Sequence, residues 1–233
     1  QRQMCIRDRY TTREVCAFGL LPFKRKGGGM KGLYVLKAYI SMLFNLCSRC
    51  KNYIKLRACG ICVGRHCVIH GHVGVNIAPS AKVSIGDNFY MSSGGHRNPL
   101  CGNIEGFFYA GENACICIGN HVGMSSTVLR AAQSITIGNY VKIGANVKVM
   151  DTDAHALDFN VRRVREEDAK QKRCAPVVIE DDVLIGVNSI ILKGVTIGAR
   201  SIIGAGSVVT KSVPSDCVAC GNPARVVKIL NTD

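Results

Sequence analysis

Residues 179–214 read IEDDVLIGVNSIILKGVTIGARSIIGAGSVVTKSVP, and an aliphatic residue recurs at every sixth position of this stretch. These positions are Ile179, Ile185, Ile191, Ile197, Ile203 and Val209. The next residue is often glycine, and the fifth residue of each hexad is valine or serine. A helix repeats at about 3.6 residues and a strand at about 2, so a period of six indicates a short strand followed by a tight corner.

The same period extends towards the N-terminus. Ile137, Ile143 and Val149 keep it, as do Ile118 and Met124, and looser matches begin at Val63. Stacked hexads form a parallel solenoid, whose core is built by the aliphatic residues and whose corners need the small ones. The sequence therefore predicts an all-β solenoid over residues 61–233, after a basic arm and helix over residues 1–60. Beyond Pro214 the period is lost, and we expect this segment to cross back over the last coil.

An amphipathic helix precedes the repeat. Apolar residues step by three and four from Leu33 through Cys47 and Cys50 to Ile54, and the run is too short and too charged to span a bilayer. Because a solenoid exposes strand edges at its ends, we expect the helix to cap the first coil with its apolar stripe. A helix lying in the plane of a membrane is the alternative, since lysines and arginines surround the stripe.

The charge of the chain is concentrated at one end. Residues 1–65 hold 14 Lys and Arg against 2 Asp and Glu, whereas the remainder holds 16 against 14. The nearly neutral body, which lacks an aromatic stacking platform, argues against a nucleic-acid partner. The basic arm could instead make peripheral contact with the inner face of a membrane.

The 13 cysteines point to a reducing compartment rather than to a metal site. No secretory signal accompanies them, so we expect a cytoplasmic location. Cys47 and Cys50 fall on the apolar stripe, where a free cysteine acts as a small hydrophobic residue. We therefore expect no metal.

Two interruptions break the repeat, near residues 92–113 and 151–176. Insertions in a solenoid form loops, which commonly carry function. The second one opens with Asp151-Thr152-Asp153-Ala154-His155, so a histidine follows directly from a coil beside two carboxylates.

The sequence resembles the hexapeptide-repeat, left-handed β-helix acyltransferases. The resemblance lies in the hexads, in the stretch VMDTDAHALD at 149–158 and in the later motifs GAGSVVTK and GNPAR. The resemblance covers roughly residues 60–230 and is strongest to the sugar O-acetyltransferase branch, which includes the galactoside and maltose acetyltransferases. It implies that His155 is the general base. The usual proline after this histidine is Ala156 here, which favours the polysaccharide-modifying enzymes of that branch.

The resemblance also implies acetyl-CoA as co-substrate and a homotrimer with sites between subunits. The residues expected along the coenzyme are Ala205, Gly206, Ser207, Thr210, Lys211 and Arg225. Small residues let the pantetheine arm lie against the backbone, and the cations meet its phosphates. The residues expected on the acceptor side are Asp151, Asp153, Ser125 and Ser126. Either aspartate could instead orient the imidazole or form a turn.

The implied reaction is direct transfer. Neutral imidazole, which titrates near pH ~6.5, takes the proton of a sugar hydroxyl as the oxygen attacks the thioester carbonyl, and a backbone N–H stabilises the oxyanion. An N-acetyltransferase acting on an amino sugar, a serine O-acetyltransferase and a non-catalytic solenoid scaffold remain alternatives. A zinc carbonic anhydrase of this fold would need three converging histidines. His70 and His72 fall in the first coils, and no paired histidines follow on the central coils, which argues against this enzyme.

Overall fold

The structure is a computed structural model that describes residues 39, 46–95 and 98–230. Every described residue except Tyr39 belongs to one compact unit within residues 41–233. The helix at 46–58 and the coils lie together in this unit.

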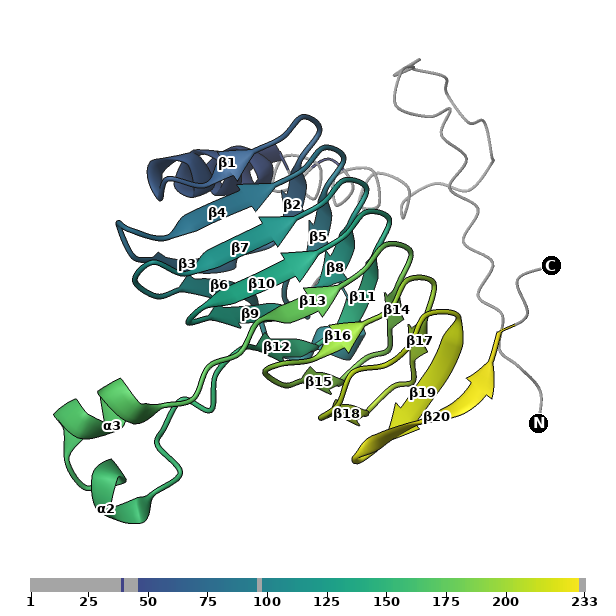
Figure 1. The fold of residues 1–233 in the computed structure, drawn as a ribbon. Coiled ribbons are helices and arrows are strands. Elements are labelled where there is room, and N and C mark those ends of the chain that lie inside the picture. The colour runs from purple at the N-terminus through teal and green to yellow at the C-terminus, as the bar shows by residue number, and fades with distance from the viewer. Residues whose placement is uncertain (1–38, 40–45, 96–97, 231–233) are drawn as a thin grey trace. The chain divides into compact units, whose positions relative to one another are not determined.

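Three sheets of mainly parallel strands surround one core (Figure 1). Sheet A contains β1 (Cys62–Val63), β4 (Lys82–Ile85), β7 (Cys115–Ile118), β10 (Ser134–Ile137), β13 (Val177–Ile179) and β16 (Thr196–Ile197). Sheet B contains β2 (Val68–His70), β5 (Tyr90–Ser92), β8 (Gly123–Ser125), β11 (Lys142–Ala145), β14 (Leu184–Ile185), β17 (Ile202–Ile203), β19 (Cys217–Gly221) and β20 (Ala224–Ile229). Sheet C contains β3 (Val73–Ile77), β6 (Gly106–Ala110), β9 (Val128–Ala131), β12 (Lys148–Met150), β15 (Ile190–Ile191) and β18 (Val208–Val209). Each coil runs through A, B and C in turn, so the predicted parallel solenoid is confirmed.

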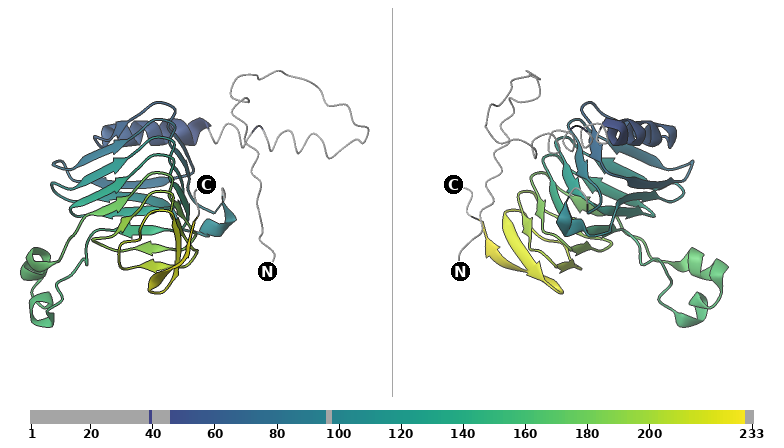
Figure 2. Two further views of the ribbon diagram at one scale, coloured as in Figure 1. Left: turned by 45° about the vertical axis from the view of Figure 1, so that its right-hand side comes forward. Right: turned by 180° about the vertical axis from the view of Figure 1, so that it is seen from behind.

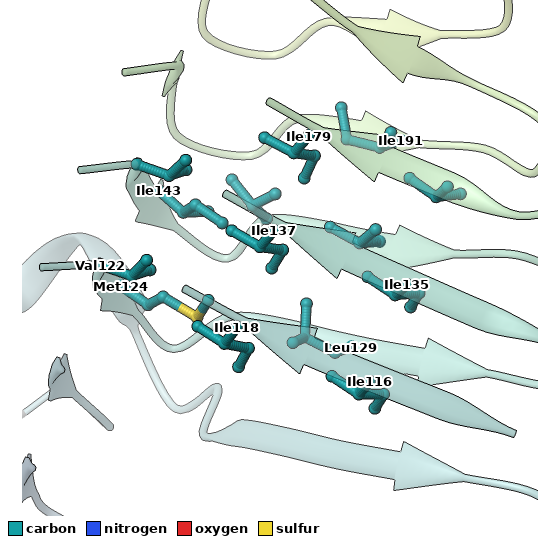
Figure 3. Close-up of a cluster of buried hydrophobic side chains, with 14 of the residues drawn as sticks. Ile116, Ile118, Val122, Met124, Leu129, Ile135, Ile137, Ile143, Ile179 and Ile191 are labelled. Carbon is teal, nitrogen blue, oxygen red and sulfur yellow. The ribbon is translucent and has the colours of Figure 1, made fainter. Parts of the chain in front are cut away.

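The hexad residues build the core. Ile179, Ile185, Ile191, Ile197, Ile203 and Val209 are all fully buried. In sheet B, Ile143 pairs with Ile185 and Ile185 with Ile203, so the side chains of successive coils stack in a column. Figure 3 shows the same arrangement around Ile137, Ile143, Ile179 and Ile191.

The fifth residue of each hexad also lies inside. Ser189, Ser201 and Ser207 are fully buried, and their hydroxyls donate to backbone carbonyls, as from Ser207 Oγ to Gly204 O at 2.6 Å. These hydrogen bonds remove the cost of burying a hydroxyl in an apolar tube.

The three edges of the solenoid are named here by the sheets they join. Edge B/C carries the first insertion and edge C/A carries the second. The first insertion spans only residues 93–105, with a 3-10 turn at Pro99–Cys101, so the predicted interruption at 92–113 is too long. Its second half is strand β6, because Phe108 and Ala110 face the core in strand alternation.

The N-terminal helix packs on the first coil with a face other than the predicted one. Asn52 and Leu56 are buried, whereas Cys47, Cys50 and Ile54 of the predicted stripe are exposed. The physical reason is the end of the solenoid, where strand carbonyls have no next coil to bond. The Asn52 amide donates to Ile69 O at 3.2 Å and to Gly71 O at 2.8 Å. Polar groups therefore decide which side of the helix faces the coil. The stripe from Leu33 to Asn45, apart from Tyr39, lies outside the described residues.

The C-terminal segment also differs from the prediction. Strand β19 joins sheet B beside β17, and β20 returns antiparallel to β19 at the edge of that sheet. The chain therefore extends one sheet and does not cross back over the last coil, because β19 finds free backbone partners on β17.

Candidate functional site

The second insertion leaves the solenoid from edge C/A, and its two arms are joined at their base. Thr152 forms an antiparallel bridge with Cys174, and the Ala175 N–H donates to Asp151 O at 2.9 Å. Beyond this base the chain forms α2 (Phe159–Arg162) and α3 (Arg165–Gln171), which project from the coils (Figure 1). The insertion predicted at 151–176 thus has helical structure of its own.

Asp151 has a structural role at this base. Its carboxylate is fully buried, and its two oxygens accept the N–H groups of Ala132 and Gln133, each at 2.7 Å. Both oxygens of the side chain are therefore occupied by hydrogen bonds to the neighbouring coil. The expectation that it contacts a sugar or orients the imidazole is wrong, and the alternative of a turn-stabilising residue fits.

His155 lies on the first arm of the insertion, and its partner comes from α3. His155 Nδ1 lies 2.6 Å from Asp168 Oδ2, while the Ala156 N–H donates to Asp168 Oδ1 at 2.7 Å. The His155 side chain is 69% exposed, whereas that of Asp168 is only 14% exposed. One carboxylate thus fixes both the ring and the backbone that follows it.

The electrostatics of this pair define the proton positions. Hydrogen bonds from His155 and from the Ala156 N–H, helped by the positive charge of Arg162, lower the pKa of Asp168 below its usual value. An ionised carboxylate only accepts hydrogen bonds, so Nδ1 of a neutral His155 carries the proton and Nε2 has a free lone pair. That is the tautomer a general base requires.

A second set of contacts holds the insertion in shape. Arg162 Nη1 donates to the carbonyls of Ala156 and Leu157, both at 2.9 Å. The Asp158 side chain caps α2 by accepting the Asn160 N–H at 2.8 Å. The backbone that follows His155 is therefore held by several hydrogen bonds.

Asp153 lies near the base of the insertion and pairs with the next coil. Lys193 Nζ lies 2.9 Å from Asp153 Oδ1, and Asp153 Oδ2 is buried without a hydrogen-bond partner. The carboxylate on the imidazole is that of Asp168, so Asp153 does not orient His155. Its free buried oxygen leaves it as a candidate for an acceptor hydroxyl.

Sequence reasoning did not identify Asp168. It lies thirteen residues after the histidine, in the run Glu166-Glu167-Asp168, and no spacing rule marks which of these acids reaches the ring. Its identity depends on the path of the chain through α2 and α3.

The residues expected along the coenzyme lie at both ends of β18. Ala205 and Gly206 are exposed on edge B/C, and Thr210 and Lys211 are exposed on edge C/A. Arg225 is exposed on β20. The Ser207 side chain points into the tube, so the expectation that it lines a groove is wrong for the side chain.

Ser125 and Ser126 support the first insertion. Ser126 is fully buried and its Oγ accepts the Gly94 N–H at 2.9 Å, while Asn98 Nδ2 lies 3.4 Å from Ser125 Oγ. Ser126 is therefore not available to an acceptor, contrary to expectation, and Ser125 keeps a partly exposed position.

The chain brings only some of these residues together. The base of the His155 insertion, Lys193 and Lys211 lie along edge C/A on successive coils, whereas Gly206 and Ser125 lie along edge B/C. Sheet C separates the two edges. Its strands have two to five residues at about 3.3 Å each, so they span about 7–17 Å between the edges.

Two features are absent from residues 39, 46–95 and 98–230. No group of three or more potential metal ligands occurs among them, and His96 lies outside them. No helix in this part of the chain combines the length and apolarity needed to cross a bilayer.

Comparisons with known proteins agree with this architecture. Residues 176–211 match the family model for the hexapeptide repeat of succinyl-transferase. The galactoside O-acetyltransferase of Lactococcus lactis is 36% identical over 131 residues, which cover 55% of this chain and 60% of that protein. A putative acetyltransferase of Schizosaccharomyces pombe is 43% identical over 99 residues, which cover 42% of this chain and 45% of that protein. The chain thus matches only about half of the length of these curated relatives.

Solved structures show the same fold. A hexapeptide-repeat containing acetyltransferase from Vibrio cholerae, complexed with acetyl coenzyme A, is 27% identical with a TM-score of 0.50, covering 89% of this chain and 94% of that one. A maltose O-acetyltransferase from Clostridium difficile is 27% identical with a TM-score of 0.52, covering 85% and 86%. By its repeat, its fold and these similarities, the chain is similar to the hexapeptide-repeat, left-handed β-helix acyltransferases.

Proposed function

We propose that this protein transfers an acetyl group from acetyl-CoA to a hydroxyl of a sugar or polysaccharide precursor. The contact that carries the proposal is the hydrogen bond between His155 Nδ1 and the ionised Asp168 carboxylate. It fixes an exposed imidazole with Nε2 free. The named activities of the similar Lactococcus lactis and Clostridium difficile proteins support a sugar acceptor.

In this mechanism His155 Nε2 takes the proton of the acceptor hydroxyl while its oxygen forms a bond to the acetyl carbonyl carbon. The carbon–sulfur bond of the thioester then breaks, and the leaving thiolate takes the proton back from the imidazolium. Asp168 stabilises the imidazolium that forms between these steps. The developing oxyanion is stabilised by a backbone N–H.

Acetyl-CoA is the proposed co-substrate, and the Vibrio cholerae neighbour with bound acetyl coenzyme A supports it. Exposed Ala205 and Gly206 would let the pantetheine arm lie against backbone, and exposed Lys211 and Arg225 would meet its phosphates. Ser207 would contribute only its backbone. Asp153 and Ser125 are the remaining candidates for the acceptor side.

We also propose a homotrimer with active sites between subunits. His155 is largely exposed on a projecting insertion, and Gly206 lies on the other edge of sheet C. Edge B/C of a neighbouring subunit would supply the second wall of the site. The proposed location is the cytoplasm, with the basic arm at the inner face of the membrane.

The test is acetyl transfer to a panel of sugar acceptors, followed as release of the coenzyme A thiol. Wild-type protein should release thiol only when a hydroxyl acceptor is present, and His155→Ala should lose roughly 10²–10⁴-fold in rate, as expected for a general base. Amino sugars and serine form separate arms of the panel. Transfer to these alone, or a His155→Ala variant of full activity, would contradict the proposal.

A further inference from the structure

The helix at 46–58 presents an apolar face to solvent. Successive helical residues are about 100° apart, so Leu46, Cys50, Tyr53 and Ile54 share one side. Ile54 is 67% exposed and Tyr53 is 48% exposed, and Leu46 and Cys50 are also exposed. Figure 2 shows this helix at the N-terminal end of the coils, where one long side of it has no neighbouring coil.

This orientation is fixed by the opposite side of the helix. Asn52 donates to the carbonyls of Ile69 and Gly71, and Lys55 Nζ donates to Val73 O at 3.0 Å. Leu56 is fully buried in the core. Rotating the helix about its axis to bury Tyr53 and Ile54 would break these hydrogen bonds and leave strand carbonyls unpaired. The fold itself therefore keeps the apolar face exposed.

The charges of the helix indicate what this face contacts. Residues 46–58 contain Arg49, Lys51, Lys55 and Arg57 and no acidic residue. By helical spacing Arg49 and Lys51 flank the apolar face on its two sides, and exposed Arg57 lies on that face at the C-terminal end of the helix. A hollow of about 310 Å³ lies beside the helix, lined by Cys47, Lys51, Lys55 and His72 among others. An apolar stripe bordered by cations complements acyl chains beneath anionic headgroups.

We propose that the outward face of helix 46–58 binds the surface of an anionic lipid bilayer. Leu46, Cys50, Tyr53 and Ile54 enter the boundary between headgroups and acyl chains, and Arg49 and Lys51 contact the phosphates. Residues 1–65 contain 14 Lys and Arg and only 2 Asp and Glu, and this positive charge adds attraction to the anionic bilayer. This inference does not depend on the proposed transfer reaction.

Co-sedimentation of the full chain with lipid vesicles tests the proposal. Binding should be strong to vesicles rich in phosphatidylglycerol, weak to pure phosphatidylcholine, and reduced by high salt. The double variant Tyr53→Ser/Ile54→Ser should bind on the order of tenfold more weakly, because apolar burial is lost. Val227→Ser/Ile229→Ser is the matched control, since these two exposed apolar residues lie on β20, and it should bind as the wild type does.

A fluorescence measurement separates insertion from simple charge attraction. The chain has no tryptophan, so Tyr53→Trp creates a single reporter on the proposed face. Its emission should shift to the blue on phosphatidylglycerol vesicles and be quenched by brominated acyl chains. Tyr140→Trp, at a similarly exposed position on edge A/B, should show neither change.

Three results would overturn the proposal. The first is a wild-type protein that does not sediment with anionic vesicles. The second is undiminished binding by a folded Tyr53→Ser/Ile54→Ser variant. The third is a Tyr53→Trp reporter that brominated lipid does not quench. A double variant that changes only the oligomeric mass would instead assign this face to contact between copies.

Discussion

At the scale of single residues, the proposed role of His155 as a base depends on Asp168, whose carboxylate contacts one ring nitrogen. Replacing Asp168 with asparagine keeps the shape of the side chain but removes its charge. A charge-assisted hydrogen bond is about twice as strong as a neutral one. The imidazolium formed during transfer therefore loses its stabilising partner, and the ring can take the other tautomer.

For Asp168→Asn we predict a loss in kcat on the order of tenfold, with a nearly unchanged KM for acetyl-CoA, since about 1.4 kcal/mol corresponds to a factor of ten. Glu167, the adjacent acid on α3, pairs with Lys170, so Glu167→Gln should have little effect. Steady-state kinetics with thermal unfolding distinguishes this role from a structural one. A lowered melting temperature that accounts for the whole loss of activity would contradict it.

Another pair at this scale gives a prediction about pH. Arg200 binds Asp216 through two hydrogen bonds, from Nε at 2.5 Å and from Nη2 at 2.6 Å, and these lower the pKa of Asp216. A carboxyl whose folded-state pKa is lowered stabilises the fold above its ordinary pKa of about 3.9, and this stabilisation is lost as the pH falls through the lowered value.

Arg200→Ala should therefore melt at a slightly lower temperature than the wild type near neutral pH. As the pH falls from about 3.9 through the lowered pKa of Asp216, the difference between the two melting temperatures should disappear, because the carboxyl is then protonated in both folded proteins. Thermal unfolding across this pH range measures the difference. A difference that is constant with pH would show that Arg200 acts through packing alone.

At the scale of secondary-structure elements, the column of hexad aliphatics holds the coils together. Ile185 is fully buried on β14, and its neighbour Leu184 on the same strand is 44% exposed. Deleting buried methylene groups costs their transfer free energy and leaves a cavity between two coils.

Ile185→Ala should lower the free energy of unfolding by about 2–5 kcal/mol, and Leu184→Ala should change it by less than about 1 kcal/mol. Chemical denaturation of both variants measures this contrast. Equal losses in the free energy of unfolding would contradict the inward position of Ile185 and the outward position of Leu184.

The strands and corners of the coils could be predicted from the sequence, whereas the orientation of the N-terminal helix could not. The hexads specify strand, corner and inward face locally, because the same packing recurs in each coil, and the strands from Val63 to Val209 follow them outside the two insertions. The orientation of helix 46–58 could not be predicted in this way. Asn52 pairs with carbonyls of residues 17 and 19 positions further along, and hydrophobic periodicity does not report such contacts.

At the scale of the whole molecule, the candidate residues fall on two edges of one solenoid. His155 and Lys211 belong to edge C/A and Gly206 to edge B/C, with sheet C between them. His155 could be predicted from the sequence, because it follows the last residues of a coil. Its partner could not, because the path through α2 and α3 depends on contacts such as those of Arg162.

If the site forms between subunits, two inactive variants should complement each other. His155→Ala, on edge C/A, and Ala205→Glu, which places a charged side chain on exposed edge B/C, should regain part of the wild-type activity when they are mixed as unfolded chains and refolded together. Some interfaces in the mixed assemblies would then combine an intact His155 with an intact Ala205. Each variant refolded alone is the control, and a mixture no more active than these would place both residues in one subunit's site.

The most direct test of the account as a whole is thermal unfolding of the full chain with and without acetyl-CoA, repeated on Lys211→Ala. Ligand at about 100 times its dissociation constant stabilises the native state by about 2.7 kcal/mol, which for a chain of this size corresponds to roughly 5–10 °C. We predict a shift of that order for the wild type and a smaller one for Lys211→Ala. No shift at millimolar acetyl-CoA would contradict the transferase account and favour a solenoid scaffold.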